Sequence, residues 1–174
     1  MRWTLGATEV RRIEETVQTR FKPEVLFPDF ERQALAEHAA WMVPEFFDFV
    51  WEDSVAPVVA AGQAQVIDDG YVLDDVLTVE PAPGHTLGHV RIRLRDGGAE
   101  AIFSGDLMHV PLQVYCPQWH TCLDDAPADG VKSRIALLET CVETNALLPP
   151  THFAAPHCCR IGQRPGGFGI DWPA

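Results

Sequence analysis

The sequence has no long apolar run and little positive charge. Its longest apolar stretches, such as residues 55–61, fall far short of the roughly 20 residues that span a bilayer. The N-terminal residues contain no apolar core typical of a secretory signal. Lys and Arg number 13 against 25 Asp and Glu, a net charge of -12, whereas phosphate binding needs clustered basic residues. We therefore expect a cytoplasmic protein that binds neither nucleic acid nor a membrane.

The chain also lacks the cysteine spacings that are typical of redox and zinc-finger sites. Its 5 cysteines form no C-x-x-C pair and no zinc-finger spacing, which favours reduced thiols in the cytosol. The adjacent Cys158 and Cys159 could be redox-active or could bind a soft metal. Small buried residues of the core are the interpretation we favour for them.

Length and composition predict one globular domain over residues 1–174, with 47% hydrophobic and 22% charged residues. The first part favours a strand at 8–15 and a helix at 30–43 with Asp29 as its N-cap. A second short helix is expected at 55–61, with Ser54 as its N-cap and Gly62 just past its end.

From residue 64 the pattern changes to strands separated by turns. The clearest strand is HVRIRLRD, in which apolar residues 90, 92 and 94 should be buried and the arginines 91, 93 and 95 solvated. Asp96-Gly97-Gly98 predicts a hairpin turn into the strand EAIFSGD. A helix is expected at 127–143, and a last strand in ALLPP. The predicted helix stripe is Val131, Ile135, Leu138 and Val142, and the glycine-rich tail should lie on the surface.

Histidine and aspartate residues stand just beyond the ends of three predicted strands. His85 precedes the clear strand, Asp106 follows the next one, and His152 follows the last. Imidazole nitrogens and carboxylate oxygens are common ligands of zinc and related metals. A single such histidine is more often only hydrogen-bonded, but three such loops at one sheet edge could hold a metal ion and leave a position open for water.

These runs resemble a known family. PAPGHTLGHVRIRL, IFSGDLMHVPLQ and PPTHFAAPH are similar to the second half of the metallo-β-lactamase fold, in the subgroup of methyl parathion hydrolase and lactonase-like enzymes. The resemblance covers roughly residues 50–170, and the N-terminal segment resembles the start of such proteins. It implies an α+β chain, a partial αββα sandwich made mainly of the C-terminal half. It also implies a hydrolase of ester, lactone or phosphotriester small molecules that acts through metal-bound hydroxide.

The resemblance also assigns residues to roles. It implies that His85 binds a first metal ion, that Asp106 bridges two ions and that His152 binds the second. It places His89, His109 and His157 behind the ligands or in the pocket, although packing or hydrogen bonding is the interpretation we favour for each of these three. The implied cofactor is zinc, or else manganese, iron or cobalt.

The family's most diagnostic motif, H-x-H-x-D-H, is absent from the sequence. The chain passes from the family's N-terminal segment at about Asp48 to its middle helix at about Phe49, as if a segment had been deleted there. Each ion would keep two of its four protein ligands, so one ion or none is expected instead of two. The inner face of the sheet would also need a new cover, either the helix 30–43 or a second copy in a homodimer.

Two functions of different classes therefore stay open. One is a metal-dependent hydrolase that uses His85, Asp106 and His152. The other is a non-catalytic remnant or interaction module of the same fold, arising from a natural deletion or from a gene model that lost a segment. A thiol enzyme that uses Cys158 beside His157 has little support, because no third group is evident to orient the pair.

Overall fold

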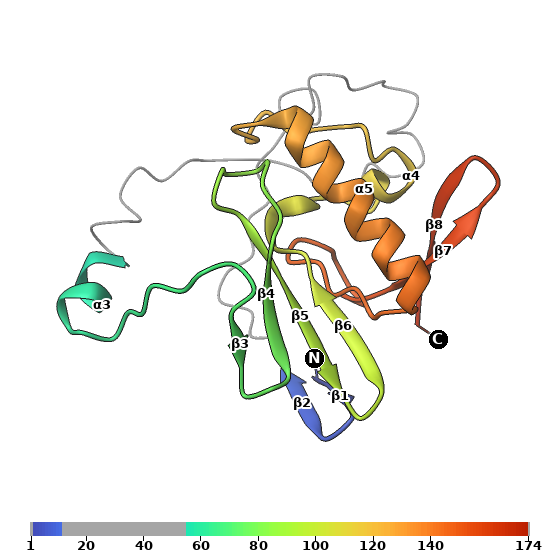
Figure 1. Ribbon diagram of the computed structural model, residues 1–174. Coiled ribbons are helices and arrows are strands. Elements are labelled where there is room, and N and C mark those ends of the chain that lie inside the picture. The colour runs from blue at the N-terminus through green and yellow to red at the C-terminus, as the bar shows by residue number, and fades with distance from the viewer. Residues whose placement is uncertain (1, 12–54, 174) are drawn as a thin grey trace.

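A four-stranded antiparallel sheet in the order β3-β4-β5-β6 forms the centre of the structure, a computed structural model that describes residues 2–11 and 55–173 (Figure 1). Two-stranded hairpins, β1-β2 and β7-β8, complete the strands. The strands are β1 (Arg2–Leu5), β2 (Thr8–Arg11), β3 (Val72–Leu73), β4 (Leu77–Pro81), β5 (Val90–Asp96), β6 (Ala99–Phe103), β7 (Arg160–Arg164) and β8 (Gly167–Asp171). The helices are α3 (Ala56–Ala60), η2 (Gly105–Leu107), α4 (Leu112–Tyr115) and α5 (Pro127–Thr144).

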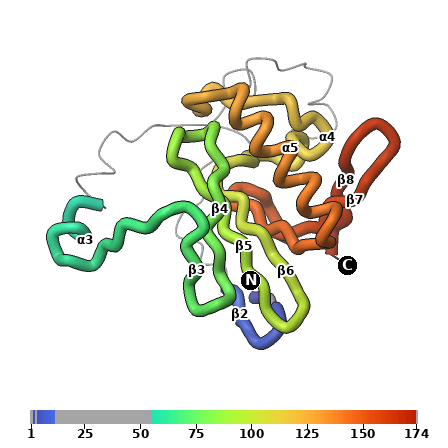
Figure 2. Tube along the Cα trace, viewed as in Figure 1, coloured from blue at the N-terminus to red at the C-terminus, as the bar shows by residue number. Residues whose placement is uncertain are grey.

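The turn between β5 and β6 is the hairpin that the sequence predicts. Asp96 pairs with Ala99, and the two glycines between them have φ values of 56° and 80°. These positive values at both central positions are those that glycine adopts most readily in a two-residue turn. The β1-β2 hairpin lies beside this turn (Figure 2), where the backbone N–H of Ala7 and the hydroxyl of Thr8 both donate to the carboxylate of Asp96. The sequence did not predict β1, although it did predict a strand that includes β2.

The main hydrophobic core lies between the sheet, α5 and the β7-β8 hairpin. Its buried side chains include Ile102 of β6, Leu137 of α5 and Ile161 of β7, together with others from η2, α4 and the loops between elements. Helix α5 matches the predicted range within a residue, but its buried face is rotated from the predicted stripe. The buried residues are Gly130, Arg134, Leu137, Leu138 and Cys141. The difference arises because this helix buries a charged side chain, Arg134, which a purely apolar stripe leaves out.

Strand β5 does not have the one buried face and one solvated face that the sequence predicts, because both of its faces are partly buried. Arg93 is only 8% exposed, whereas Ile92 is 37% exposed. Arg93 forms ion pairs with Glu80 at 2.7 Å and Glu100 at 3.1 Å, and these partners offset the cost of burying its charge. On the opposite face, Leu94 is buried against Leu5 of the N-terminal hairpin.

One prediction for the C-terminal region is wrong. ALLPP forms no strand, and Leu147 and Leu148 make only isolated bridges to Ala101 and Cys159. The glycine-rich tail lies largely on the surface as predicted, but it forms the β7-β8 hairpin, which is anchored because Ile161 is buried in the core. Glycines at 166 and 167 fall at the hairpin's turn, where the sequence pattern alone did not separate a hairpin from a loop.

Three of the five cysteines are core residues. All five are free thiols, and Cys141, Cys158 and Cys159 are buried. Burial raises the pKa of Cys141 and of Cys159 to about 12, so these thiols remain protonated near neutral pH. This agrees with the interpretation of Cys158 and Cys159 as small buried side chains.

The N-terminal predictions fall partly outside the described residues. The helix at 30–43, its cap Asp29 and the join at Asp48-Phe49 all lie in the part that is not described. Helix α3 begins at Ala56 with Val55 at its N-cap rather than Ser54, and Gly62 follows its end with a φ of 68°. In the described ranges, no helix has the length and apolar character needed to cross a membrane.

Candidate metal centre

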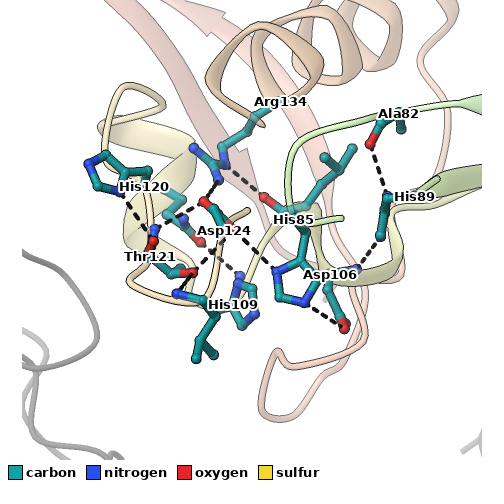
Figure 3. A network of polar contacts seen from close by, with 12 residues as sticks. Ala82, His85, His89, Asp106, His109, His120, Thr121, Asp124 and Arg134 are labelled. Atoms are coloured by element: carbon teal, nitrogen blue, oxygen red, sulfur yellow. Dashed lines mark hydrogen bonds and ion pairs between the residues drawn. The ribbon is translucent and has the colours of Figure 1, made fainter. Parts of the chain in front are cut away.

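The three predicted ligand loops meet at one edge of the central sheet, and Figure 3 shows two of their side chains, those of His85 and Asp106. His85 lies in the turn before β5, and Asp106 lies in η2, directly after β6. Because β5 and β6 are antiparallel neighbours, the start of one and the end of the other lie at the same edge. His152 comes to this edge from the turn that follows Pro150.

Asp106 is the centre of the cluster, and its two carboxylate oxygens face different histidines. Nε2 of His152 lies 2.9 Å from Oδ1, and Nε2 of His85 lies 3.5 Å from Oδ2. The pKa of Asp106 is lowered to about 2, mainly by the hydrogen bond from His152 and also by the positive charges that the neighbouring histidines can carry, whereas burial acts in the opposite direction. The carboxylate is therefore ionised at any pH near neutrality.

His85 is held from its other side by a residue that the sequence did not single out. Its Nδ1 lies 3.2 Å from Oδ1 of Asp124, a carboxylate whose side chain is 1% exposed. Figure 3 shows the His85 ring between these two acids, with one nitrogen directed to each. His85 is thus fixed at both ring nitrogens.

His89 forms hydrogen bonds to backbone atoms rather than to the side chains of the predicted ligands. Its Nδ1 lies 3.0 Å from the carbonyl oxygen of Ala82, and its Nε2 accepts the backbone N–H of Asp106 at 2.9 Å. Burial lowers the pKa of His89, which favours the neutral ring that this pair of bonds requires. A Cβ at Gly105, where φ is 53°, would lie 2.6 Å from His89 Nε2, so this position requires glycine. The hydrogen-bonding interpretation fits His89.

His109 joins the cluster as a buried, stacked ring. It is 9% exposed, and its ring is parallel to that of His152, with centroids 4.9 Å apart and planes 7° apart. Its centroid also lies 5.2 Å from that of His85. Burial lowers the pKa of His109 to about 3, so the ring is neutral near pH 7. Its Nδ1 is buried and has no hydrogen-bond partner among the described residues, whereas its backbone N–H donates to Gln113 at 2.7 Å.

His157 follows the same loop as His152. Its Nδ1 lies 2.8 Å from the carbonyl oxygen of Phe153, and its backbone has a φ of 64°. This local hydrogen bond fits the interpretation of His157 as a hydrogen-bonded residue.

Arg134 is a second residue of the site that the sequence did not reveal. Its guanidinium is buried and donates to the carbonyl oxygens of Leu107 at 2.7 Å, Pro117 at 2.8 Å and Trp119 at 2.9 Å. It also lies 3.8 Å from the carboxylate of Asp124. In the sequence, no spacing links Asp124 or Arg134 to His85.

The side chains of the cluster are of the chemical types that bind a divalent cation, but their arrangement is not that of a metal site. It offers an ionised carboxylate and imidazole nitrogens, which zinc, manganese, iron and cobalt all accept. Within residues 2–11 and 55–173, however, no three His, Cys, Asp or Glu side chains are arranged as a metal site. The donors form two histidine–carboxylate pairs that share Asp106, so the three-ligand site remains a prediction.

No known family profile matches the sequence, and no curated protein is significantly similar to it. Several solved structures do match the fold. AidC, a dizinc quorum-quenching lactonase crystallised with a product, aligns with a TM-score of 0.61 at 17% identity, over 72% of this chain and 47% of its own. The hydrolase AbOPH of the β-lactamase superfamily aligns with a TM-score of 0.65 at 20% identity, over 70% of this chain and 42% of its own.

A probable metal-dependent hydrolase from Staphylococcus aureus aligns with a TM-score of 0.56 at 14% identity, over 65% of this chain and 41% of its own. The chain thus spans less than half the length of each of these proteins. At such low identity the match bears on the fold alone. The mixed helices and antiparallel sheets of the described residues form part of the metallo-β-lactamase fold.

Proposed function

We propose that the chain is a metal-dependent hydrolase of small-molecule esters, lactones or phosphotriesters, in which His85, Asp106 and His152 hold the cation. The observation that supports this most is the position of Asp106 between two imidazoles, with a different Nε2 on each oxygen. Such an arrangement suits a carboxylate that lies between two cation-binding histidines and faces each of them with a different oxygen. Two of the solved structures with a similar fold are described as a dizinc lactonase and as a probable metal-dependent hydrolase.

The protein's own residues supply a preset binding surface. Asp106 needs no deprotonation step, because its pKa is about 2. With Asp124 accepting from Nδ1 of His85, the Nε2 lone pair is directed at Asp106 Oδ2, 3.5 Å away. Two lone pairs that face each other at this distance repel unless a cation or a proton lies between them. A bound divalent cation would supply Lewis acidity and bring the pKa of water near 7.

A second candidate is a binding module of the same fold without catalytic activity. It is favoured by the absence of H-x-H-x-D-H from the sequence and of a three-donor metal site from the described residues. Under this proposal, the Asp106 cluster would be held by its hydrogen bonds alone. Metal binding and turnover separate the two candidates.

The homodimer and the cytoplasmic location stay proposals. Ile92 on the face of β5 away from Arg93 is 37% exposed, which is consistent with an apolar face that a second copy could cover. A molecular mass of two chains by light scattering would support the dimer. A monodisperse monomer at micromolar concentration would contradict it.

The experiment that tests the hydrolase is turnover of an aryl ester, an aliphatic lactone and an aryl phosphotriester by zinc- or manganese-loaded protein. We expect at least one substrate to be hydrolysed, and a chelator to abolish the activity. Asp106→Asn should remove it as well, whereas Asp125→Asn, which makes the same change at an exposed acid, should retain it. Rates equal to the buffer background on all three, or full activity in Asp106→Asn, would contradict the proposal.

A further inference from the structure

We propose that Asp124 is a positioning residue that fixes the ring orientation and the protonated nitrogen of His85. The inference rests on the proposed function, because that function makes His85 a metal ligand. The contacts between Asp124 and His85 that support the inference are those of the structure without a metal. Asp124 lies in the loop before α5, 39 residues from His85 in sequence, and its side chain is 1% exposed. A buried carboxylate is costly unless its oxygens are paired, so each of its contacts is informative.

Both oxygens of Asp124 are occupied. Oδ1 lies 3.2 Å from Nδ1 of His85 and 3.2 Å from the hydroxyl of Thr121. Oδ2 accepts the backbone N–H of Thr121 at 3.1 Å and lies 3.8 Å from Nη2 of Arg134. The carboxylate therefore cannot rotate without losing several contacts, and its position relative to His85 is set by the loop and by α5.

An ionised carboxylate only accepts hydrogen bonds, so Nδ1 of His85 must carry the proton in this contact. The neutral ring then has its lone pair on Nε2, the nitrogen that faces Asp106 at 3.5 Å. Residues that bond the second nitrogen of a metal-binding histidine fix its tautomer and raise its basicity. Asp124 is in the place, and has the charge, for this role.

The backbone of the same loop holds the backbone of His85. The N–H of Asp125 donates to the carbonyl oxygen of His85 at 3.1 Å, and the N–H of Ala126 donates to that of Gly84 at 2.9 Å. The hydroxyl of Ser133 on α5 adds a third bond, to the carbonyl oxygen of Pro83, at 2.7 Å. One segment therefore holds both the ring and the backbone of His85. These contacts would fix the position of the histidine before a metal binds.

The test uses nitrogen-15 NMR of the full-length, metal-free protein at pH 8, which reports which nitrogen of His85 carries the proton. We expect Nδ1–H in the wild type and a shift toward Nε2–H in Asp124→Ala, with no change in Asp69→Ala, which alters an exposed acid outside this loop. Zinc affinity, measured by calorimetry, should fall about 10- to 100-fold in Asp124→Ala alone. An unchanged His85 tautomer in Asp124→Ala would overturn the inference.

Asp124 is buried, so a variant that keeps its size is needed in case Asp124→Ala does not fold. Asp124→Asn keeps one acceptor oxygen without the charge, and it should retain the Nδ1–H tautomer with a weaker hydrogen bond, seen as a changed Nδ1 shift. An Nδ1 shift identical to that of the wild type would overturn the role of the charge. If the wild type binds no zinc, the proposed function fails, while the metal-free tautomer measurement still decides the inference.

Discussion

Gly84 packs against Gly130 so closely that a Cβ built on Gly84 would lie 2.1 Å from the Cα of Gly130. This contact joins the loop that carries His85 to the first turns of α5. The φ of Gly84, 144°, is also one that other residues rarely adopt. The ligand loop and the helix therefore form one unit.

We predict that Gly84→Ala destabilises the protein by about 2–5 kcal/mol, because it adds backbone strain and a clash with backbone atoms. Gly88→Ala is the matched control in the same loop, since a Cβ there meets nothing within 4 Å and should change stability by no more than about 0.5 kcal/mol. Urea unfolding followed by circular dichroism measures both. Equal stabilities for the two variants would mean that the Gly84–Gly130 contact is not as close as described.

Arg134 should be among the most important charged residues for stability. Arg134→Met removes three hydrogen bonds to carbonyl oxygens and the cation beside Asp124, and we expect a loss of about 3–5 kcal/mol. Lys132→Met changes a residue on the same helix that is 77% exposed, and it should cost about 0.5 kcal/mol or less. The free energy of unfolding in urea separates them. A small effect in Arg134→Met would show that its carbonyl contacts are replaced by water.

Local patterns in the sequence predicted the hairpin at Asp96-Gly97-Gly98 and helix α5. They also predicted the three loops that carry His85, Asp106 and His152. Turn chemistry and helical periodicity act over a few residues, so they can be read directly. Asp124 could not be assigned to the site, because its partner His85 is distant in sequence and only the folded chain brings them together. The burial of Arg93 was missed for a similar reason, since it depends on Glu80 and Glu100 from two other strands.

His109 should make the metal-free protein sensitive to acid. Burial lowers its pKa to about 3 in the folded protein, whereas an unfolded histidine titrates near its ordinary value of 6.5. Between these values the unfolded chain binds a proton that the folded chain does not. The contribution of the buried, neutral His109 to the stability of the fold is therefore fully present above about pH 6.5, and it is lost as the pH falls toward 3.

His109→Gln removes this linkage. Between pH 7.5 and pH 5, the wild type should lose up to about 2 kcal/mol of stability more than His109→Gln does. His157→Gln, which changes a histidine held by Phe153 instead, should behave like the wild type. The measurement is urea unfolding at both pH values with a chelator present. The same pH dependence in all three proteins would contradict the buried, neutral state of His109.

Metal binding at the Asp106 cluster tests the central claim most directly. Purified protein loaded with zinc, then freed of excess by gel filtration, is measured by elemental analysis beside His152→Ala. We predict about one ion per chain in the wild type and clearly less in the variant, because Asp106 would keep only one histidine partner. No zinc above background in the wild type, or equal zinc in both proteins, would contradict a metal site built on His85, Asp106 and His152.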